Sequence, residues 1–310
     1  MNKRQLLSLA FLLGPITALG ATPVGQLSQF RADSSLVLVG ATVEDTHDRP
    51  VRGLTRQDFR LFSDKVEQTI RYFGEEDVPL SLAVVFDTSG SMSGKLDSMR
   101  GALAAVLGTA NPEDEFSLIT FADHPQIAVP WTRDAGQVQN HVLAKPAHGR
   151  TALLDAIALG LQLIRQAHNP RRAIVVFSDG GDNYSRFSER ALARQLEETD
   201  VQLYAIDTSD FLMPPANSYA ESAYEPPQTN LLSSLCDGAA GQYFQISNAR
   251  DPERIAEQIS LELRSQYVLG FSPSTLAGDG KFHRLQLRVQ SPSGAHLLIH
   301  WRRGYRAPVD

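Results

Sequence analysis

Residues 80–107 have the sequence LSLAVVFDTSGSMSGKLDSMRGALAAVL, and this stretch decides the fold class. Its first part, Leu80–Phe86, is an almost unbroken apolar run of strand length, which is typical of a strand buried on both faces of a sheet. A turn of small and polar residues follows, and then an apolar set at helical spacing, Leu96, Met99, Leu103 and Val106. The stretch is therefore predicted to be a strand, a turn and a helix in direct succession.

The same alternation continues through the middle of the chain. Apolar runs of strand length occur at Leu80–Phe86, Phe116–Phe121, Ile174–Phe177, Val201–Ile206 and Gln242–Ile246. Further apolar sets at helical spacing are Leu153, Leu154, Ile157, Leu161 and Ile164, and Ile255, Ile259 and Leu263. Strands that alternate with helices are typical of α/β proteins with a doubly wound, mostly parallel sheet. We predict such a domain over residues 80–262.

The segments on either side are predicted to be rich in β-strands. Residues 28–78 contain extended segments such as Leu36–Val39 and Thr69–Phe73, and residues 263–310 contain Tyr267–Phe271, His283–Val289 and His296–Trp301. The simplest interpretation is that the two segments pair into one small β-rich unit, with the α/β domain inserted within it. Two separate flanking units would produce the same pattern. The Pro-rich residues 211–229 are predicted to form a long loop beside the sheet.

The first twenty residues have the three-part layout of a secretory signal peptide. Lys3 and Arg4 form a basic head, an apolar run extends from Leu6 to Leu19, and Gly20 is a small residue at the expected cleavage position. We expect residues 1–20 to be removed. A retained membrane anchor is the alternative, but the run is shorter than the about 20 residues of a typical span. The protein is therefore expected to be exported to the periplasm, cell surface or medium, with no transmembrane segment after cleavage.

Composition excludes several classes of protein. Of the 310 residues, 29 are Lys or Arg, 35 are Asp or Glu and one is Cys, and the formal charge is −6. A single Cys excludes a disulfide scaffold and a Cys-rich metal site, and the acidic balance argues against nucleic-acid binding. Cys236 is predicted to be a small buried residue. The arginine pairs Arg171-Arg172 and Arg302-Arg303 are predicted to be solvated surface.

Three predicted loops carry hard oxygen donors. These are Asp87, Ser89 and Ser91 after the first strand of the α/β domain, Thr151 at the start of a helix, and Asp179 after the strand that ends at Phe177. In a doubly wound sheet, ligands bind outside the carboxyl ends of the strands. Carboxylate and hydroxyl oxygens without thiols or imidazoles suit Mg²⁺ or another hard cation. By itself, the Asp-x-Ser-x-Ser turn is equally well explained as a helix N-cap.

These loops resemble the motifs of the von Willebrand factor type A (VWA) family. The motifs are Asp87-Thr88-Ser89-Gly90-Ser91-Met92, Gly149-Arg150-Thr151-Ala152-Leu153 and Ser178-Asp179-Gly180-Gly181-Asp182-Asn183. The resemblance implies a Rossmann-like α/β domain with a metal-ion-dependent adhesion site (MIDAS), whose residues here would be Asp87, Ser89, Ser91, Thr151 and Asp179. The flanks, among them Gln266–Phe271, are similar to an exported acidobacterial-type group of this family, although Ser63-Asp64-Lys65-Val66 stands where that group often has an Asp-Gly turn.

The resemblance implies an exported, metal-dependent protein-binding or adhesion module. The coordination of a divalent cation, Mg²⁺ or alternatively Mn²⁺ or Ca²⁺, would be completed by an Asp or Glu carboxylate of a protein partner. Loops such as Asp182–Phe187 would set specificity. The alternatives are a metal-dependent hydrolase and a structural envelope component in which the metal only stabilises the loops. The chain has neither a Gly-x-Ser-x-Gly elbow nor a His-Glu-x-x-His motif, and we expect no enzymatic activity.

Overall fold

The computed structural model describes residues 36–47, 49–75, 79–208, 231–246, 252–273, 280–291 and 294–307. The predicted signal peptide at residues 1–20 and the predicted loop at residues 211–229 lie outside the described residues. None of the helices within the described ranges combines the length and the apolar character that a bilayer crossing requires.

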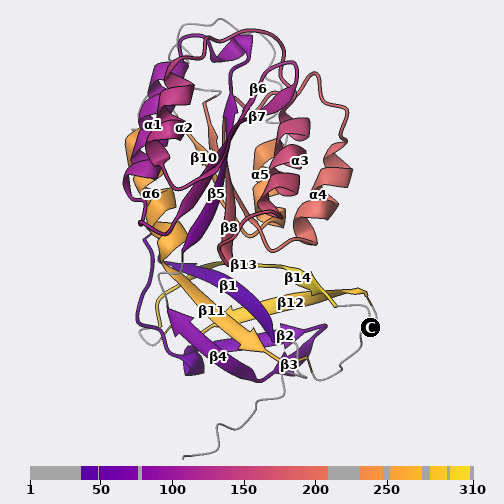
Figure 1. Cartoon of the computed structure of the whole chain (residues 1–310). Coiled ribbons are helices and arrows are strands. Elements are labelled where there is room, and N and C mark those ends of the chain that lie inside the picture. The colour runs from indigo at the N-terminus through magenta and orange to yellow at the C-terminus, as the bar shows by residue number, and fades with distance from the viewer. Residues whose placement is uncertain are drawn as a thin grey trace, which may run out of the picture. The chain divides into compact units, whose positions relative to one another are not determined.

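The central strand β5 (Leu80–Asp87) belongs to a six-stranded sheet with the order β10-β9-β8-β5-β6-β7. The other strands are β6 (Glu115–Phe121), β7 (Pro125–Thr132), β8 (Arg171–Ser178), β9 (Gln202–Asp207) and β10 (Tyr243–Gln245). The strands from β10 to β6 are parallel, and β7 pairs antiparallel with β6. Every residue of β5 is buried, because helices cover both faces of the sheet (Figure 1).

The side chains of β5 alternate between two hydrophobic cores, since successive residues of a strand point to opposite faces. Leu82, Val84 and Phe86 pack with one layer of helices, and Ala83 and Val85 pack with the other. The first layer comprises α1 (Leu96–Gly108), α2 (Ala135–Leu143) and α6 (Pro252–Arg264), and the second comprises α3 (Leu153–Ile164), α4 (Glu189–Glu197) and α5 (Leu231–Gly238) (Figure 1).

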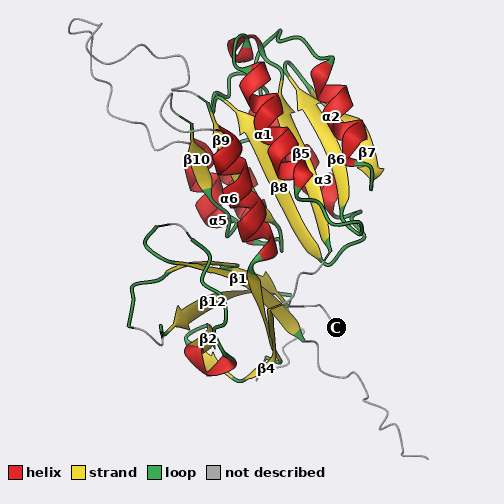
Figure 2. Cartoon of the chain, turned by 90° about the vertical axis from the view of Figure 1, so that its left-hand side faces the viewer, coloured by secondary structure: helices red, strands yellow, loops and turns green. Residues whose placement is uncertain are grey.

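The flanking segments form two four-stranded antiparallel sheets, with the orders β13-β1-β11-β4 and β14-β12-β2-β3 (Figure 2). Their strands are β1 (Val37–Glu44), β2 (Phe59–Ser63), β3 (Val66–Gln68), β4 (Ile70–Glu75), β11 (Gln266–Phe271), β12 (Phe282–Val289), β13 (Leu298–Trp301) and β14 (Gly304–Arg306). Each sheet contains strands from both flanks, since Val39 pairs with Leu269 and Leu61 pairs with Leu287. These four residues belong to one shared core.

The predicted fold class, an α/β domain with a mostly parallel sheet and a β-rich unit built from both flanks, is confirmed. The β-rich unit consists of two sheets.

The sequence prediction did not include β7, α2, α4 or α5. β7 contains Pro125 and Pro130, which are tolerated because β7 lies at the edge of the sheet. The helices α2 and α4 bury only two side chains each, so they have too few apolar residues at helical spacing to form a recognisable pattern. Cys236 is buried on α5, as predicted.

The turn at Ser63-Asp64-Lys65-Val66 joins β2 to β3 without a glycine. Asp64 and Lys65 both have positive φ, 47° and 70°, as a type I′ hairpin turn requires. The carboxylate of Asp64 supports this turn, because its Oδ1 accepts a 2.9 Å hydrogen bond from the backbone N–H of Arg284. Lys65 thus occupies the position at which an Asp-Gly turn has its glycine.

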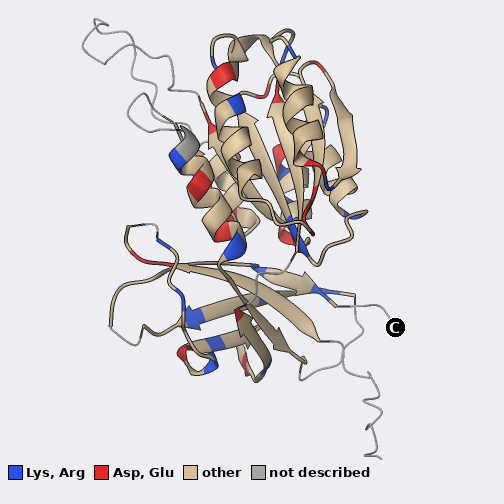
Figure 3. Ribbon diagram, turned by 60° about the vertical axis from the view of Figure 1, so that its left-hand side comes forward, with Lys and Arg blue, Asp and Glu red and all other residues tan. Residues whose placement is uncertain are grey.

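Charged residues of both signs are interspersed over the α/β domain and over the β-rich unit (Figure 3). Local electrostatics at individual sites decide what each surface can bind.

Candidate metal-binding site

Asp87 is the last residue of β5, and its side chain is fully buried. Its Oδ1 accepts a 2.8 Å hydrogen bond from the backbone N–H of Ser89, and its Oδ2 accepts a 2.6 Å hydrogen bond from the hydroxyl of Ser178. The bond to the residue two positions further on forms an Asx-type turn. Ser178 is the last residue of the neighbouring strand β8. The carboxylate therefore joins the ends of two strands and has a fixed orientation.

The turn after Asp87 brings two serine hydroxyls together. Ser89 precedes the 3-10 turn η2 (Gly90–Met92), and Ser91 lies within that turn. Their Oγ atoms are 3.1 Å apart. Two oxygens on neighbouring corners of an octahedron around Mg²⁺, with Mg–O bonds of about 2.1 Å, lie about 3.0 Å from one another. The observed separation fits two adjacent ligands of such an ion.

Thr151 lies on a loop that backbone hydrogen bonds connect to both other loops. The carbonyl of Gly149 accepts from the N–H of Gly90 at 3.0 Å, and the carbonyl of Thr151 accepts from the N–H of Asn183 at 3.0 Å. In return, Asn183 Oδ1 accepts from the N–H of Thr151 at 3.0 Å. Gly149 has φ of +80°, and a Cβ at this position would lie 2.9 Å from Asp123 Oδ2. The structure thus brings all three predicted loops together.

Asp179 follows β8 directly, and its carboxylate lies beside a buried ammonium group. Nζ of Lys95 is 3.3 Å from Oδ2 of Asp179, and the two side chains are 11% and 10% exposed. Lys95 is the residue before α1. The site therefore contains two carboxylates, of Asp87 and Asp179, and one balancing ammonium group. A bound cation would compensate the remaining negative charge.

Burial raises the pKa of Asp87 to about 6. Desolvation is the largest cause, and the negative charge of Asp179 acts in the same direction. Hydrogen bonds from Ser178 and Ser89 oppose this increase because they stabilise the charged carboxylate. A cation close to these carboxylates would stabilise their charged forms further.

The donor chemistry of the site fits a hard divalent cation. Within the described ranges, no three His, Cys, Asp or Glu side chains are grouped so that they can hold a metal ion. A metal site here therefore depends on hydroxyl oxygens. The hydroxyls of Ser89, Ser91 and Thr151 and the carboxylate of Asp179 would hold the ion, whereas Asp87 would act from behind the turn because both of its oxygens already accept hydrogen bonds.

Four residues that support the site were given no role by the sequence analysis. These are Lys95, Asp123, Ser178 and Asn183. Ser178 and Asn183 lie in the same motif as Asp179, so their place in that motif could have indicated a role. Lys95 and Asp123 had no comparable signal, because each interacts with a residue from a different loop.

The comparison with protein families identifies the α/β part of the chain. Residues 82–181 match the family described as von Willebrand factor type A domain. The chain contains a VWA domain. The matched range includes all five residues of the candidate site, from Asp87 to Asp179.

The curated relatives resemble only part of this chain. Inter-alpha-trypsin inhibitor heavy chain H4 of Bos taurus is 29% identical over 108 residues, which cover 32% of this chain and 12% of that protein. Its counterpart in Sus scrofa is 26% identical over 143 residues, which cover 42% of this chain and 16% of that protein. The matched residues thus span less than a fifth of the length of either relative.

Among solved structures, the chain is similar to the von Willebrand factor type A protein from Catenulispora acidiphila. It is 13% identical in sequence, and the superposition has a TM-score of 0.49. The match covers 89% of this chain and 76% of that chain.

Proposed function

We propose that this VWA protein is an exported, metal-ion-dependent protein-binding module of the adhesion type. A divalent cation, Mg²⁺ or alternatively Mn²⁺ or Ca²⁺, binds at a MIDAS-type site made of Asp87, Ser89, Ser91, Thr151 and Asp179. The observation that carries this proposal is the 3.1 Å separation of the Ser89 and Ser91 hydroxyl oxygens, on a turn that the buried Asp87 carboxylate holds in place.

The cation would supply an electrophilic centre that attracts an Asp or Glu carboxylate from a protein partner. Ser89, Ser91 and Thr151 are neutral ligands, so they leave much of the charge of the ion uncompensated. Lys95 lies 3.3 Å from Asp179 and reduces the negative charge of that carboxylate. This arrangement favours a carboxylate from outside as the last ligand.

The loop at Asp182–Phe187 is preorganised beside the candidate site. Asp182 Oδ1 accepts hydrogen bonds from the N–H of Leu154 at 3.2 Å and from the hydroxyl of Ser185 at 2.5 Å. Asp155 Oδ1 accepts from the N–H of Phe187 at 2.8 Å. Because both ends of the loop are bonded to α3, a partner would meet an ordered surface.

An exposed aromatic and cationic cluster lies next to Thr151. Tyr184 is 40% exposed, the guanidinium carbon of Arg150 is 4.9 Å from the centre of its ring, and the ring of His124 is 5.7 Å away. Tyrosine and arginine are enriched among the residues that dominate binding energy at protein interfaces. The guanidinium of Arg150 would also favour an acidic partner. We therefore assign partner contact to this cluster.

The test is affinity capture from the native cell envelope with the immobilised chain, in Mg²⁺ and in EDTA. We expect capture of a protein partner in Mg²⁺ only. Ser89→Ala should lose capture together with Mg²⁺ binding, and Tyr184→Ser should lose capture while Mg²⁺ binding is retained. Ser93→Ala changes an exposed serine on the same turn and should behave as the parent chain does. Equal capture in all samples would refute the proposal.

The proposed role is non-catalytic, in keeping with the usual behaviour of VWA domains as binding modules. Phosphoester and peptide substrates should therefore show no turnover that depends on Asp87. The proposed location is outside the cytoplasm. Fractionation of cells that express the chain, followed by mass spectrometry of its N-terminus, should find it in the envelope or medium and beginning after Gly20.

A further inference from the structure

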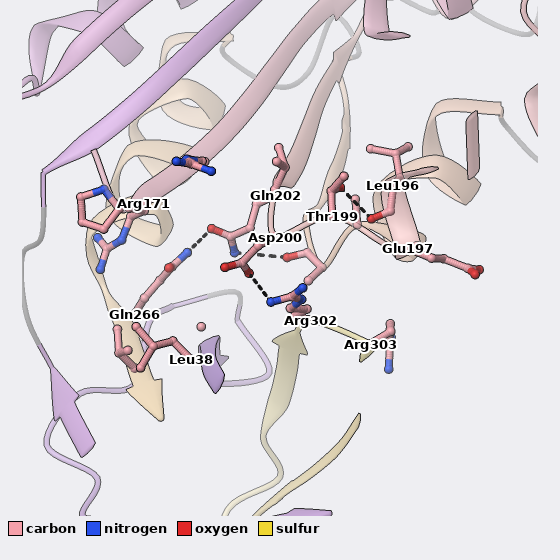
Figure 4. Close-up of a pocket in the computed structure, with 18 of the residues that line it drawn as sticks. Leu38, Arg171, Leu196, Glu197, Thr199, Asp200, Gln202, Gln266, Arg302 and Arg303 are labelled. Atoms are coloured by element: carbon pink, nitrogen blue, oxygen red, sulfur yellow. Dashed lines mark hydrogen bonds and ion pairs between the residues drawn. The ribbon is translucent and has the colours of Figure 1, made fainter. Parts of the chain in front are cut away.

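Two arginine pairs that lie far apart in the sequence line the same cavity. Arg171 and Arg172 begin β8, and Arg302 and Arg303 follow β13. All four residues line a cavity of about 370 Å³ (Figure 4). The sequence analysis predicted that both pairs lie on the solvated surface, and this prediction is wrong for Arg171. Only 7% of this residue is exposed, and its guanidinium donates a 2.6 Å hydrogen bond to the carbonyl of Leu263.

The walls of this cavity are largely apolar. Leu38, Tyr72 and Val268 come from the sheet that contains β1, β4 and β11, and Leu36 directly precedes β1. Leu196, Val201, Ala239 and Ala240 come from the α/β domain. Along β1, Val39 and Ala41 face the core of the β-rich unit, so Leu38 points to the opposite face. A sheet face that lies outside the core normally carries polar residues. Here Leu36 and Leu38 are both 44% exposed, which leaves apolar surface available to a ligand.

The arginines supply hydrogen-bond donors at the edge of this apolar space. Arginine guanidinium groups hold carboxylates through charge-assisted hydrogen bonds. The lining contains four arginines against Glu197 and Asp200, and is therefore net positive. Asp200 neutralises part of this charge, since it lies 3.4 Å from Nη1 of Arg302 (Figure 4).

We propose that this cavity binds a fatty acid of medium chain length. Its carboxylate pairs with the guanidinium groups of Arg172 and Arg302, which are two of the four arginines that line the cavity. Its unbranched chain lies against Leu36, Leu38 and the apolar residues opposite. The volume is at the lower end of the about 300–1,000 Å³ that is typical of small-molecule pockets, which favours a medium-length chain over a long one.

The proposed fatty-acid site is separate from the candidate metal site. Arg171 and Gln202 are the first residues of β8 and β9, whereas Asp87 and Asp179 are at or beyond the last residues of β5 and β8. The two sites therefore lie at opposite ends of a parallel sheet. Fatty-acid binding should not depend on Mg²⁺, and its failure would leave the proposed metal-dependent function untouched.

Calorimetric titration of the full chain tests the class of ligand. Decanoate should bind, and affinity should rise about fourfold for each methylene from hexanoate to decanoate. Decanol lacks the charge and acetate lacks the chain, so both should bind at least tenfold more weakly than decanoate. EDTA should change none of these values. Equal binding of decanol and decanoate, or affinity that does not depend on chain length, would overturn the proposal.

Paired variants test the residues. Leu38→Ser should weaken decanoate binding about tenfold or more, whereas Leu298→Ser should not, since Leu298 is an exposed leucine on the adjacent strand β13 and does not line the cavity. Arg302→Gln should weaken binding similarly, and Arg133→Gln, on a loop outside the cavity, should not. Thermal melts confirm folding of each variant. If Arg302→Gln fails to fold, Arg172→Gln gives the same test.

Two further outcomes would count against a fatty acid. Unchanged decanoate affinity in both Leu38→Ser and Arg172→Gln would place the ligand elsewhere on the protein. Tighter binding of an apolar peptide with a free C-terminal carboxylate, in competition with decanoate, would assign the cavity to a peptide instead.

Discussion

The hydroxyl of Ser178 donates a 2.6 Å hydrogen bond to Oδ2 of Asp87, and this bond connects the ends of β8 and β5. Both residues are fully buried. A buried hydrogen bond to a charged group is stronger than one between neutral groups. Ser178 therefore helps to orient the Asp87 carboxylate, which in turn holds the backbone of Ser89 and the two serine hydroxyls.

Ser178→Ala should weaken Mg²⁺ binding about tenfold, because loss of a hydrogen bond to a charged group costs about 1.5–3 kcal/mol. Isothermal titration calorimetry with Mg²⁺ measures the effect. Ser117→Ala is the matched control, since Ser117 is also a buried serine but donates to the carbonyl of Val129 at 2.7 Å. This control should lower stability without changing Mg²⁺ affinity. A Ser178→Ala protein with the parent's Mg²⁺ affinity would contradict the assigned role.

Mg²⁺ should raise the melting temperature of the chain, and EDTA should reverse the change. At about 100 times the dissociation constant, a ligand that binds only the folded state stabilises it by about 2.7 kcal/mol. For a domain of this size that corresponds to about 5–10 °C. Differential scanning calorimetry of the parent and of Ser89→Ala provides the comparison, and the variant should show no response to Mg²⁺. An equal response would mean that the ion binds elsewhere.

Gly149→Ala should destabilise the Thr151 loop and weaken Mg²⁺ binding. Its φ of +80° is unfavourable for alanine, and the new Cβ would approach Asp123 Oδ2 to 2.9 Å. We expect a loss of about 1–2 kcal/mol from the backbone alone. Gly53→Ala separates the two causes, because Gly53 has φ of +77° but a Cβ added there would meet no atom within 4 Å. Only the Gly149 variant should also lose Mg²⁺ affinity, in denaturation and binding experiments run side by side.

The Glu115 carboxylate should stabilise the folded chain at pH values above the range in which a glutamate ordinarily titrates. Burial raises the pKa of Glu115, but hydrogen bonds from Ser81 and His168 outweigh burial, and the pKa is lowered overall. The Ser81 hydroxyl and the His168 N–H both lie 2.6 Å from Oε1. Because the folded pKa lies below the unfolded one, this stabilisation is present above about pH 4.3 and is lost as the pH falls through the folded pKa.

Glu115→Gln tests this pH dependence through urea denaturation between about pH 6 and pH 3. The free energy of unfolding of the variant should fall less steeply with acid than that of the parent chain. Parallel curves over the whole range would show that Glu115 does not contribute to the acid sensitivity.

The local sequence pattern was sufficient to predict the central strand and the helix that follows it. The almost unbroken apolar run at Leu80–Phe86 indicated a strand with two buried faces, and the helical spacing after it indicated α1. The same reasoning failed for β7, whose Pro125 and Pro130 disfavour a strand, because only the position of that strand at the sheet edge makes them acceptable. Propensity is a local property, whereas edge position is a property of the whole sheet.

The residues of the candidate site could also be named from the sequence, since three short motifs place Asp87, Ser89, Ser91, Thr151 and Asp179 after predicted strands or at a helix start. Their partners could not. Lys95 and Asp179 are 84 residues apart and Ser178 and Asp87 are 91 apart, so no local pattern connects them.

The sequence by itself determined the alternation of strands and helices and the type of donor at the loops, because both depend on side-chain chemistry at short spacing. Only the tertiary structure decided which residues from distant parts of the chain lie next to one another. It paired Ser178 with Asp87, and it placed Arg171-Arg172 and Arg302-Arg303 around one apolar cavity. The physical reason is that burial and charge compensation depend on distance in space, which the order of residues alone does not specify.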